Sequence, residues 1–149
     1  MRVYRADLSE ADAAYRIVSE YYEAVGVVVR EGRAAFENEY FGEGVGLWLA
    51  TVNDVVVGCI GLHRLPQLHE SGEIKRLYVR PGHRGQGVAE ALLMELEGYA
   101  AQHGNKALYL DSKDDLESAI RFYRRHGYQP CERYNDNPQA TIFMYKQLK

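Results

Sequence analysis

The chain contains 149 residues, of which 46% are hydrophobic and 26% charged, and its formal net charge is −3. This length is typical of one domain with its own core, so we expect a single domain over residues 1–149. The negative balance argues against nucleic acid as a partner. The charged first residues and the short apolar runs argue against a secretory signal and a membrane span, so we expect a cytoplasmic protein.

The two cysteines, Cys59 and Cys131, have neither the spacing of metal ligands nor neighbours that would activate a thiol. We therefore predict reduced thiols and no metal site.

The first half of the chain alternates helical and strand-like periodicity. Asn53-Asp54 separates two segments rich in β-forming residues, which predicts a hairpin with a two-residue turn. In chain order, the expected elements are a strand over Val3–Arg5, a helix capped by Ser9 and running to about Val25, a helix over Arg33–Tyr40, and strands over Leu47–Val52 and Val55–His63.

The second half interleaves strands and helices, which predicts a layered α/β fold with a mixed sheet. Ile74, Leu77 and Val79 do not alternate strictly, and a β-bulge would explain that break. The expected elements are a strand over Glu73–Val79, a helix over Gly87–His103, a strand over Lys106–Asp111, a helix begun by a capping box of Asp114 and Glu117, and strands over Tyr128–Tyr134 and Thr141–Lys146.

The most informative segment joins a strand to a helix through Arg84-Gly-Gln-Gly-Val-Ala89. Gly85 and Gly87 remove side chains where backbone amides could meet a bulky anion, and the helix start adds unpaired amides. From Lys75 to Arg84 there are four Lys or Arg, one His and no acid. This pattern favours a pyrophosphate site, although a tight turn with solvated arginines has the same sequence pattern.

Two common phosphate-binding motifs are excluded at this loop. A P-loop would need Gly-Lys-Ser/Thr at the helix start, and a dinucleotide fingerprint would need glycine where Glu90 stands.

Arg84-Gly-Gln-Gly-Val-Ala89 resembles the acyl-coenzyme A (CoA) pyrophosphate loop, Arg/Gln-x-x-Gly-x-Gly/Ala, of the GNAT superfamily of N-acetyltransferases. The preceding Glu73–Val79 strand and the later Ala119–Tyr128 segment match the family in order and spacing. The resemblance covers the chain well from about Val45 to Tyr128. It implies a three-layer fold with a mixed, mostly antiparallel sheet of about six to seven strands, about four helices and a bulged central strand.

The resemblance also implies an acetyl-CoA site. Backbone groups of the strand would pair with the pantetheine arm as an added strand does, and amides of the loop would hold the pyrophosphate. The implied cofactor-binding residues are Leu77, Tyr78, Val79, Arg84, Gly85, Gln86, Gly87, Val88, Ala89 and Ser112.

Tyr123 and Glu73 are the candidate catalytic residues. Tyr123 matches the family tyrosine that faces the cofactor sulfur and would assist the departing thiolate, but its spacing also fits a core tyrosine on the apolar stripe of the helix. Glu73 matches a strand carboxylate that takes the proton of the amine, but a surface glutamate at a strand start fits equally well.

The chain departs from the family pattern at Leu116, where many members have an asparagine that contacts the pantetheine. Ser112 or Ser118 could replace that contact. A basic cluster on the same helix either assists the 3′-phosphate of the cofactor or forms a solvated face. That cluster comprises Arg121, Arg124 and Arg125.

The expected acceptor is a primary amine on a small molecule, a peptide or a protein. Residues that could line its site are Tyr21, Tyr22, Glu39, Arg64 and Asp136. Edge strands near the C-terminus are compatible with a homodimer. An acyl-CoA-binding regulatory domain without turnover, and a nucleotide-binding or purely structural α/β domain, are the alternative interpretations.

Overall fold

The computed structural model describes residues 1–27 and 30–148. Its sheet has seven strands in the order β1-β2-β3-β4-β5-β7-β6. The β4–β5 pair is parallel, and every other pair of neighbouring strands in this sheet is antiparallel. The expected mixed, mostly antiparallel sheet is confirmed. The strands are β1 Arg2–Arg5, β2 Gly46–Val52, β3 Val55–Arg64, β4 Ser71–Val79, β5 Ala107–Ser112, β6 Gln129–Pro130 and β7 Ile142–Gln147.

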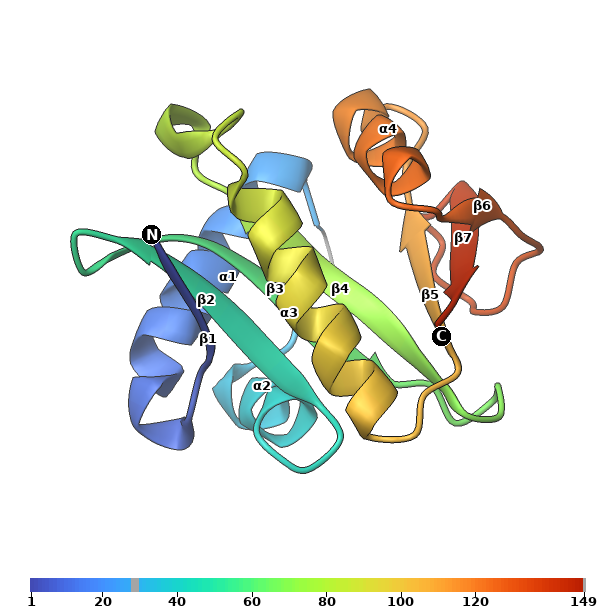
Figure 1. Ribbon diagram of the computed structural model, residues 1–149, viewed down its shortest axis with the longest axis horizontal. Helices are drawn as coiled ribbons and strands as arrows, with labels where there is room; N and C mark the ends of the chain where they lie inside the picture. Colours follow the sequence, from blue (N-terminus) through green and yellow to red (C-terminus); the bar gives the residue numbers. More distant parts are fainter. Residues whose placement is uncertain (28–29, 149) are drawn as a thin grey trace.

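Helices cover both faces of this sheet and form a three-layer arrangement (Figure 1). α1 and α2 pack on one face, whereas α3 and α4 pack on the other, with α3 running along the central strands. The helices are α1 Ala11–Val25, α2 Arg33–Tyr40, α3 Val88–Gln102 and α4 Glu117–Arg125.

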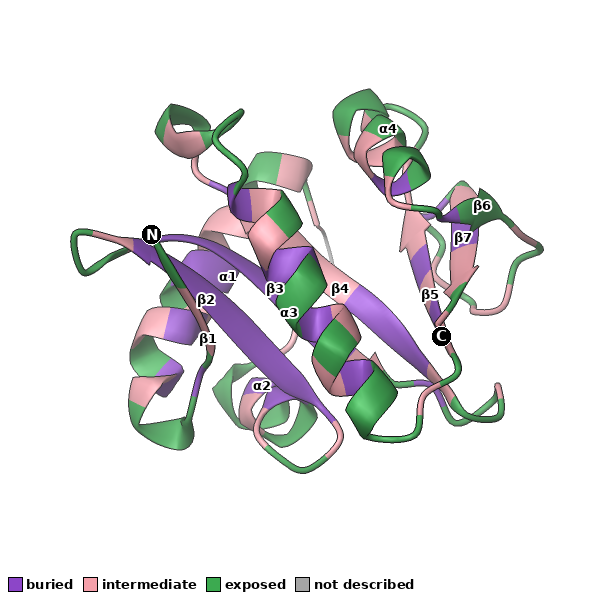
Figure 2. Ribbon diagram, in the orientation of Figure 1, coloured by how far each residue is buried: buried purple, intermediate pink, exposed green. Residues whose placement is uncertain are grey.

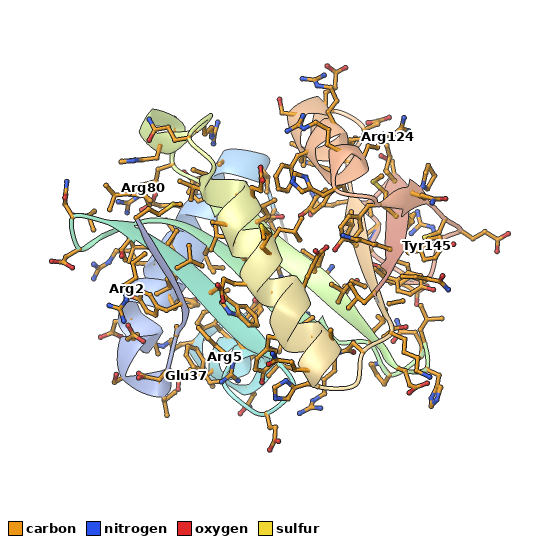
Figure 3. The ribbon with its side chains drawn as sticks, in the orientation of Figure 1. Arg2, Arg5, Glu37, Arg80, Arg124 and Tyr145 are labelled. Atoms are coloured by element: carbon orange, nitrogen blue, oxygen red, sulfur yellow. The ribbon has the colours of Figure 1, made fainter. Side chains whose placement is uncertain are left out.

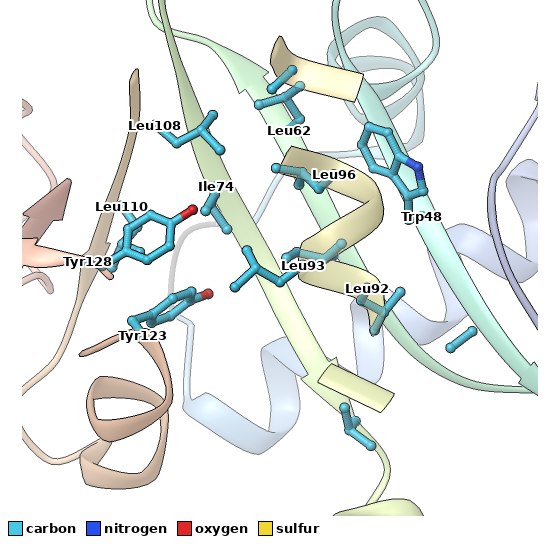
Figure 4. Packing of buried hydrophobic residues seen from close by; sticks show 14 of the residues in the cluster. Trp48, Leu62, Ile74, Leu92, Leu93, Leu96, Leu108, Leu110, Tyr123 and Tyr128 are labelled. Carbon is cyan, nitrogen blue, oxygen red and sulfur yellow. The ribbon is translucent and has the colours of Figure 1, made fainter. Parts of the chain in front are cut away.

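The hydrophobic core is divided by the sheet into two clusters. Strand β2 is buried along nearly its whole length because it has a helical layer on each side (Figure 2). On the α3 face, Leu92, Leu93 and Leu96 pack toward Trp48 and Ile74 (Figure 4). Each fully buried side chain of this kind contributes about 1.5–3 kcal/mol, so the two clusters together hold the sheet and its helices in place.

The predicted bulge lies in β4. The register with β3 shifts between the Cys59–Tyr78 and Gly61–Lys75 pairs, and Arg76 has a φ of 62°. A bulge places two consecutive side chains on the same face of a sheet. Lys75 and Arg76 accordingly both make their contacts on the α1 side, whereas Ile74 and Leu77 pack on the α3 side.

Strands β4 and β5 separate soon after they meet. Their pairing covers only Ser71–Ala107, Gly72–Leu108 and Glu73–Tyr109, after which the two strands diverge (Figure 1). The sheet is therefore open between the second half of β4 and the end of β5, beside the loop that leads into α3.

Three local expectations are wrong. Asp7, not Ser9, caps the first turn through a capping box with Glu10, and Ser9 lies within the 3-10 turn Leu8–Glu10. Helix α4 begins at Glu117 without a side-chain cap, so Asp114 and Glu117 form no capping box.

The strand expected over Tyr128–Tyr134 is reduced to Gln129–Pro130. Proline has no amide to donate to a strand ladder, and the ladder ends with the bond from the Cys131 amide to the Phe143 carbonyl at 2.8 Å. The following residues form a loop instead.

Candidate active site

The loop between β4 and α3 has the open backbone expected of an anion site. Gly85 and Gly87 have φ values of 76° and 83°, in the left-handed region that glycine adopts without strain. A Cβ atom placed on either residue would meet nothing within 4 Å. No hydrogen bond from the amides of Gly85, Gln86 or Gly87 is found within the described residues, so these donors are available to a ligand.

Helix α3 adds to this set of donors. Its N-terminal residue is Val88, its N-cap is Gly87, and no side chain caps it. The first amides of the helix and the positive end of its dipole therefore face the loop. This loop and helix start meet the geometric requirement for a pyrophosphate.

The two arginines that flank the loop differ in their partners. Arg80 donates two hydrogen bonds to the Glu20 carboxylate, at 2.9 and 2.6 Å, and is held near the base of the loop (Figure 3). Arg84 donates through Nε to the Val79 carbonyl at 2.8 Å and is otherwise exposed. Arg84 is therefore the better placed of the two to contact an anion.

The other cofactor-binding candidates border the opening of the sheet. Leu77, Tyr78 and Val79 form the part of β4 that β5 does not pair, and Ser112 ends β5. In contrast, Ser118 is exposed on α4, as are the three arginines of that helix; Arg124 lies on its outer side (Figure 3). The basic cluster is therefore a solvated face in this structure.

Tyr123 lies at this opening from the α4 side. It is 5% exposed, and its ring packs against Tyr128 with a centroid distance of 5.5 Å. Both hydroxyls point toward β4 (Figure 4). Burial, then the nearby Tyr21 and Asp111, raises the pKa of Tyr123, so its phenol stays protonated. The Tyr123 hydroxyl is thus a protonated donor that points toward β4 (Figure 4).

Glu73 is not a surface residue, since its side chain is 8% exposed. Its Oε2 accepts hydrogen bonds from the Tyr134 hydroxyl at 2.7 Å and from Asn135 Nδ2 at 3.2 Å. Burial, then the negative charge of Glu73, raises the pKa of Tyr134, which keeps that phenol in its donating form.

A second carboxylate, which the sequence reading missed, lies beside Glu73. Asp111 at the end of β5 is 9% exposed, and its Oδ2 accepts from Lys75 Nζ at 3.1 Å and from Asn135 Nδ2 at 2.6 Å. Lys75 Nζ is also 3.5 Å from Glu73 Oε2. We name Glu73, Lys75, Asp111, Tyr134 and Asn135 the carboxylate cluster.

The charges in this cluster do not cancel. Although burial alone would raise it, the pKa of Asp111 is lowered by Lys75 and by hydrogen bonds from Asn135 and Asn137. Two carboxylates therefore share one ammonium. The sequence signal for Asp111 was its place near the end of the regular strand Ala107–Ser112. This place puts Asp111 opposite the part of β4 that no longer pairs with β5.

The acceptor-site candidates are dispersed. Tyr21 and Tyr22 lie against the Arg76 guanidinium, with its carbon 5.9 and 5.1 Å from their ring centroids. Glu39 is 3.2 Å from His63, and Asp136 is exposed. Only the two tyrosines adjoin the opening of the sheet.

Arg64 lies at the opposite end of the sheet, where it lines a cleft of about 390 Å³. Other residues of that cleft include His63, Glu70, Ser71 and His103. Ser71 begins β4, whereas the glycine loop follows its last residue, so this cleft is separate from the candidate active site.

Neither a metal-binding cluster nor a membrane-spanning helix is found in the part of the chain that the structure describes. No three His, Cys, Asp or Glu side chains gather in a way that could hold a metal ion. No helix in residues 1–27 and 30–148 is long and apolar enough to cross a membrane.

An open parallel strand pair beside an uncapped helix start is the arrangement that the resemblance to acyl-CoA-dependent acyltransferases implies. The Acetyltransferase (GNAT) family profile matches residues 11–128. The chain therefore belongs to the GNAT acetyltransferase family.

Relatives and a solved structure agree with this assignment. The chain is 34% identical to the aminoalkylphosphonate N-acetyltransferase of Salmonella typhimurium, covering 83% of this chain and 82% of the relative. It is 31% identical to an uncharacterized N-acetyltransferase of Schizosaccharomyces pombe, over 71% of this chain and 64% of that protein's length. A GNAT-family acetyltransferase of Staphylococcus aureus shares the fold, with a TM-score of 0.84, 21% identity and 99% of each chain covered.

Proposed function

We propose that this protein transfers an acetyl group from acetyl-CoA to a primary amine. The observation that carries the proposal is the opening between β4 and β5, which ends at the unpaired amides of the Gly85–Gly87 loop. Family membership and two relatives named as N-acetyltransferases support the same reaction.

The loop residues would hold the pyrophosphate, since their amides are unpaired and space is open above Gly85 and Gly87. The unpaired edge at Leu77–Val79 would receive the pantetheine arm as an added strand. When bound, acetyl-CoA supplies the thioester whose acetyl group is transferred. Ser112 borders the same opening and replaces the polar contact that Leu116 cannot make.

Tyr123 would assist the departing sulfur by donating a hydrogen bond. An unperturbed tyrosine has a pKa near 10 and a thiol near 8.5, so full proton transfer is already uphill by about 2 kcal/mol. Burial raises the pKa of Tyr123 further, which disfavours transfer but preserves the donating proton. Stabilisation of the developing thiolate by this hydroxyl is therefore its role.

Glu73 would act on the incoming amine. A primary amine has a pKa near 10.4 and arrives protonated, so a proton must leave before the nitrogen can attack the acetyl carbon. Glu73 Oε2 is occupied by Tyr134 and Asn135, whereas no partner for Oε1 is found within the described residues. Oε1 is also not fully buried, so a ligand can reach it. This oxygen receives the ammonium and accepts its proton.

The acceptor is a small-molecule amine or an amine of a peptide or protein. The S. typhimurium relative carries a name that specifies an aminoalkylphosphonate, which favours a small molecule.

The first experiment is a calorimetric titration with acetyl-CoA, with ATP and NAD as controls. We expect binding to acetyl-CoA alone, and loss of that binding in Gly87→Glu, which adds bulk and negative charge at the loop. Gly104→Glu is the matched control, because Gly104 also has a positive φ and open space but lies beyond the other end of α3.

Equal binding to all three ligands, or equal loss in both variants, would contradict the proposed cofactor site. Release of CoA thiol in the presence of amines then separates an enzyme from an acyl-CoA-binding regulatory domain, which would bind the cofactor without turnover.

A further inference from the structure

Unpartnered buried polar atoms gather beside the β4 bulge. Within the described residues, four buried side-chain atoms have neither a hydrogen-bond partner nor an ion-pair partner: Tyr22 Oη, Glu31 Oε1, Tyr40 Oη and Arg76 Nε. Buried polar groups are nearly always paired, so an accumulation of this kind calls for a physical cause.

These atoms belong to one group of side chains between α1, α2, β3 and β4. Arg76 Nη2 is 3.2 Å from Glu31 Oε2, and the guanidinium carbon is 5.1 Å from the Tyr22 ring centroid. The Tyr40 and His63 rings have centroids 4.6 Å apart. Tyr40 packs beside the bulge, because a Cβ atom placed on Gly61, the β3 partner of Lys75, would lie 2.5 Å from Tyr40 Cε1.

Hydrogen-bond donors exceed acceptors in this group. A guanidinium has five N–H donors, and within the described residues one bond from Arg76 is found, the one to Glu31. The Tyr22 and Tyr40 hydroxyls add two more donors and are 2% and 0% exposed as residues. Glu31 Oε1 is the one unpaired atom that can only accept. An oxyanion with two or three oxygens would satisfy the excess donors.

The bulge joins this group to the carboxylate cluster. Arg76 follows Lys75 directly, and both side chains make their contacts on the α1 side of β4. A ligand whose ammonium meets Glu73 Oε1 therefore lies on the same face of β4 as the Arg76 guanidinium.

We propose that Arg76, with the hydroxyls of Tyr22 and Tyr40, binds an oxyanion of the acceptor, so that the substrate is a zwitterion with an amine at one end and a carboxylate or phosphonate at the other. This inference rests on the proposed function. In the structure Glu31 pairs with the Arg76 guanidinium through one carboxylate oxygen only. The oxyanion of the acceptor would displace the Glu31 carboxylate from this pair.

The experiment compares acceptors of matched length in a thiol-release assay: 3-aminopropylphosphonate, 4-aminobutyrate and n-butylamine. We expect kcat/KM to be about 10- to 100-fold higher for at least one anionic acceptor than for butylamine, as charged hydrogen bonds allow. Arg76→Gln abolishes that preference and leaves butylamine turnover unchanged. The two anionic acceptors distinguish a carboxylate from a phosphonate.

Two further variants test the details. Arg80→Gln removes an arginine that is already paired with Glu20, and it keeps the preference. Glu31→Gln lowers KM for the preferred anionic acceptor, because the competing carboxylate is gone. The inference is overturned if Arg76→Gln keeps the preference for anionic acceptors or loses activity equally with all three amines. It is also overturned if KM for the preferred acceptor is unchanged in Glu31→Gln.

A titration with propylphosphonate, which carries no amine, makes the test independent of turnover. We expect binding to the wild-type protein and none to Arg76→Gln. Equal binding to both proteins, or none to either, overturns the oxyanion site. If the protein binds propylphosphonate through Arg76 but does not bind acetyl-CoA, only the proposed function is contradicted. If it acetylates all three amines equally, only the inference of an oxyanion site is contradicted.

Discussion

The hydroxyl of Tyr123 points toward β4 beside the place where β4 and β5 separate (Figure 4). Its helix belongs to the α3 layer, and the side chain is buried in the core cluster on that face. The proposed role of this hydroxyl, donation of a hydrogen bond to the leaving thiolate, requires a protonated phenol in this position.

We expect Tyr123→Phe to lower kcat by roughly 100-fold, as loss of one donor to a developing anion does, while acetyl-CoA affinity is unchanged. Steady-state thiol release and calorimetry measure the two quantities. Tyr128→Phe is the control, because the hydroxyl of this neighbouring tyrosine is already committed to Glu97, to which it donates at 2.7 Å. Equal loss of kcat in the two variants would assign Tyr123 a packing role.

The β2–β3 hairpin is the element whose form follows most directly from local chemistry. Asn53 and Asp54 have φ values of 51° and 64°, the left-handed pair that a two-residue turn between twisted strands demands. Both residues tolerate this conformation, although glycine adopts it at lower cost. The turn sets the register in which β2 pairs with β3.

We expect Asp54→Gly to raise the free energy of unfolding by about 0.5 kcal/mol and Asp54→Ala to lower it by a similar amount. Urea unfolding at constant m-value measures both. Because both changes alter the turn and no candidate active-site residue, turnover should be the same in both variants. The reverse order of stabilities would show that the Asp54 side chain, not its backbone angle, decides the turn.

At the scale of the whole molecule, the opening between β4 and β5 interrupts an otherwise continuous sheet. The strands pair at three positions and then separate, so the backbone edge of β4 is left without a partner. The two core clusters, which include Ile74 and Tyr22, pack on the two faces of the sheet. A ligand that fills the gap links the β4 and β5 halves of the fold.

Saturating acetyl-CoA should therefore raise the melting temperature. A ligand present at a concentration of about 100 times its Kd stabilises the folded protein by about 2.7 kcal/mol. In a chain of this size each kcal/mol raises Tm by about 2–4 °C, so we expect a shift of about 5–10 °C. Differential scanning calorimetry measures it. Gly87→Glu should show no shift with the ligand, and a shift of equal size in that variant would place the stabilising ligand elsewhere.

The sequence by itself determined the features that depend on neighbours along the chain. The hairpin follows from Asn53-Asp54, the bulge from the broken alternation of Glu73–Val79, and the anion loop from Gly85 and Gly87. Each of these is a local conformational requirement of a few residues. The capping of α4 and the length of the strand after Tyr128 were predicted wrongly, because packing and the proline decided them.

Only the tertiary structure decided which side chains surround Glu73 and Arg76. Glu73 accepts hydrogen bonds from Tyr134 and Asn135, which are 61 and 62 residues away in the sequence. Arg76 donates to Glu31, which is 45 residues away. Such contacts depend on strand order, register and the divergence of β4 from β5, none of which a linear pattern specifies. Asp111 reads in the sequence as the end of a strand, and it becomes a partner of Glu73 only because that strand lies beside β4.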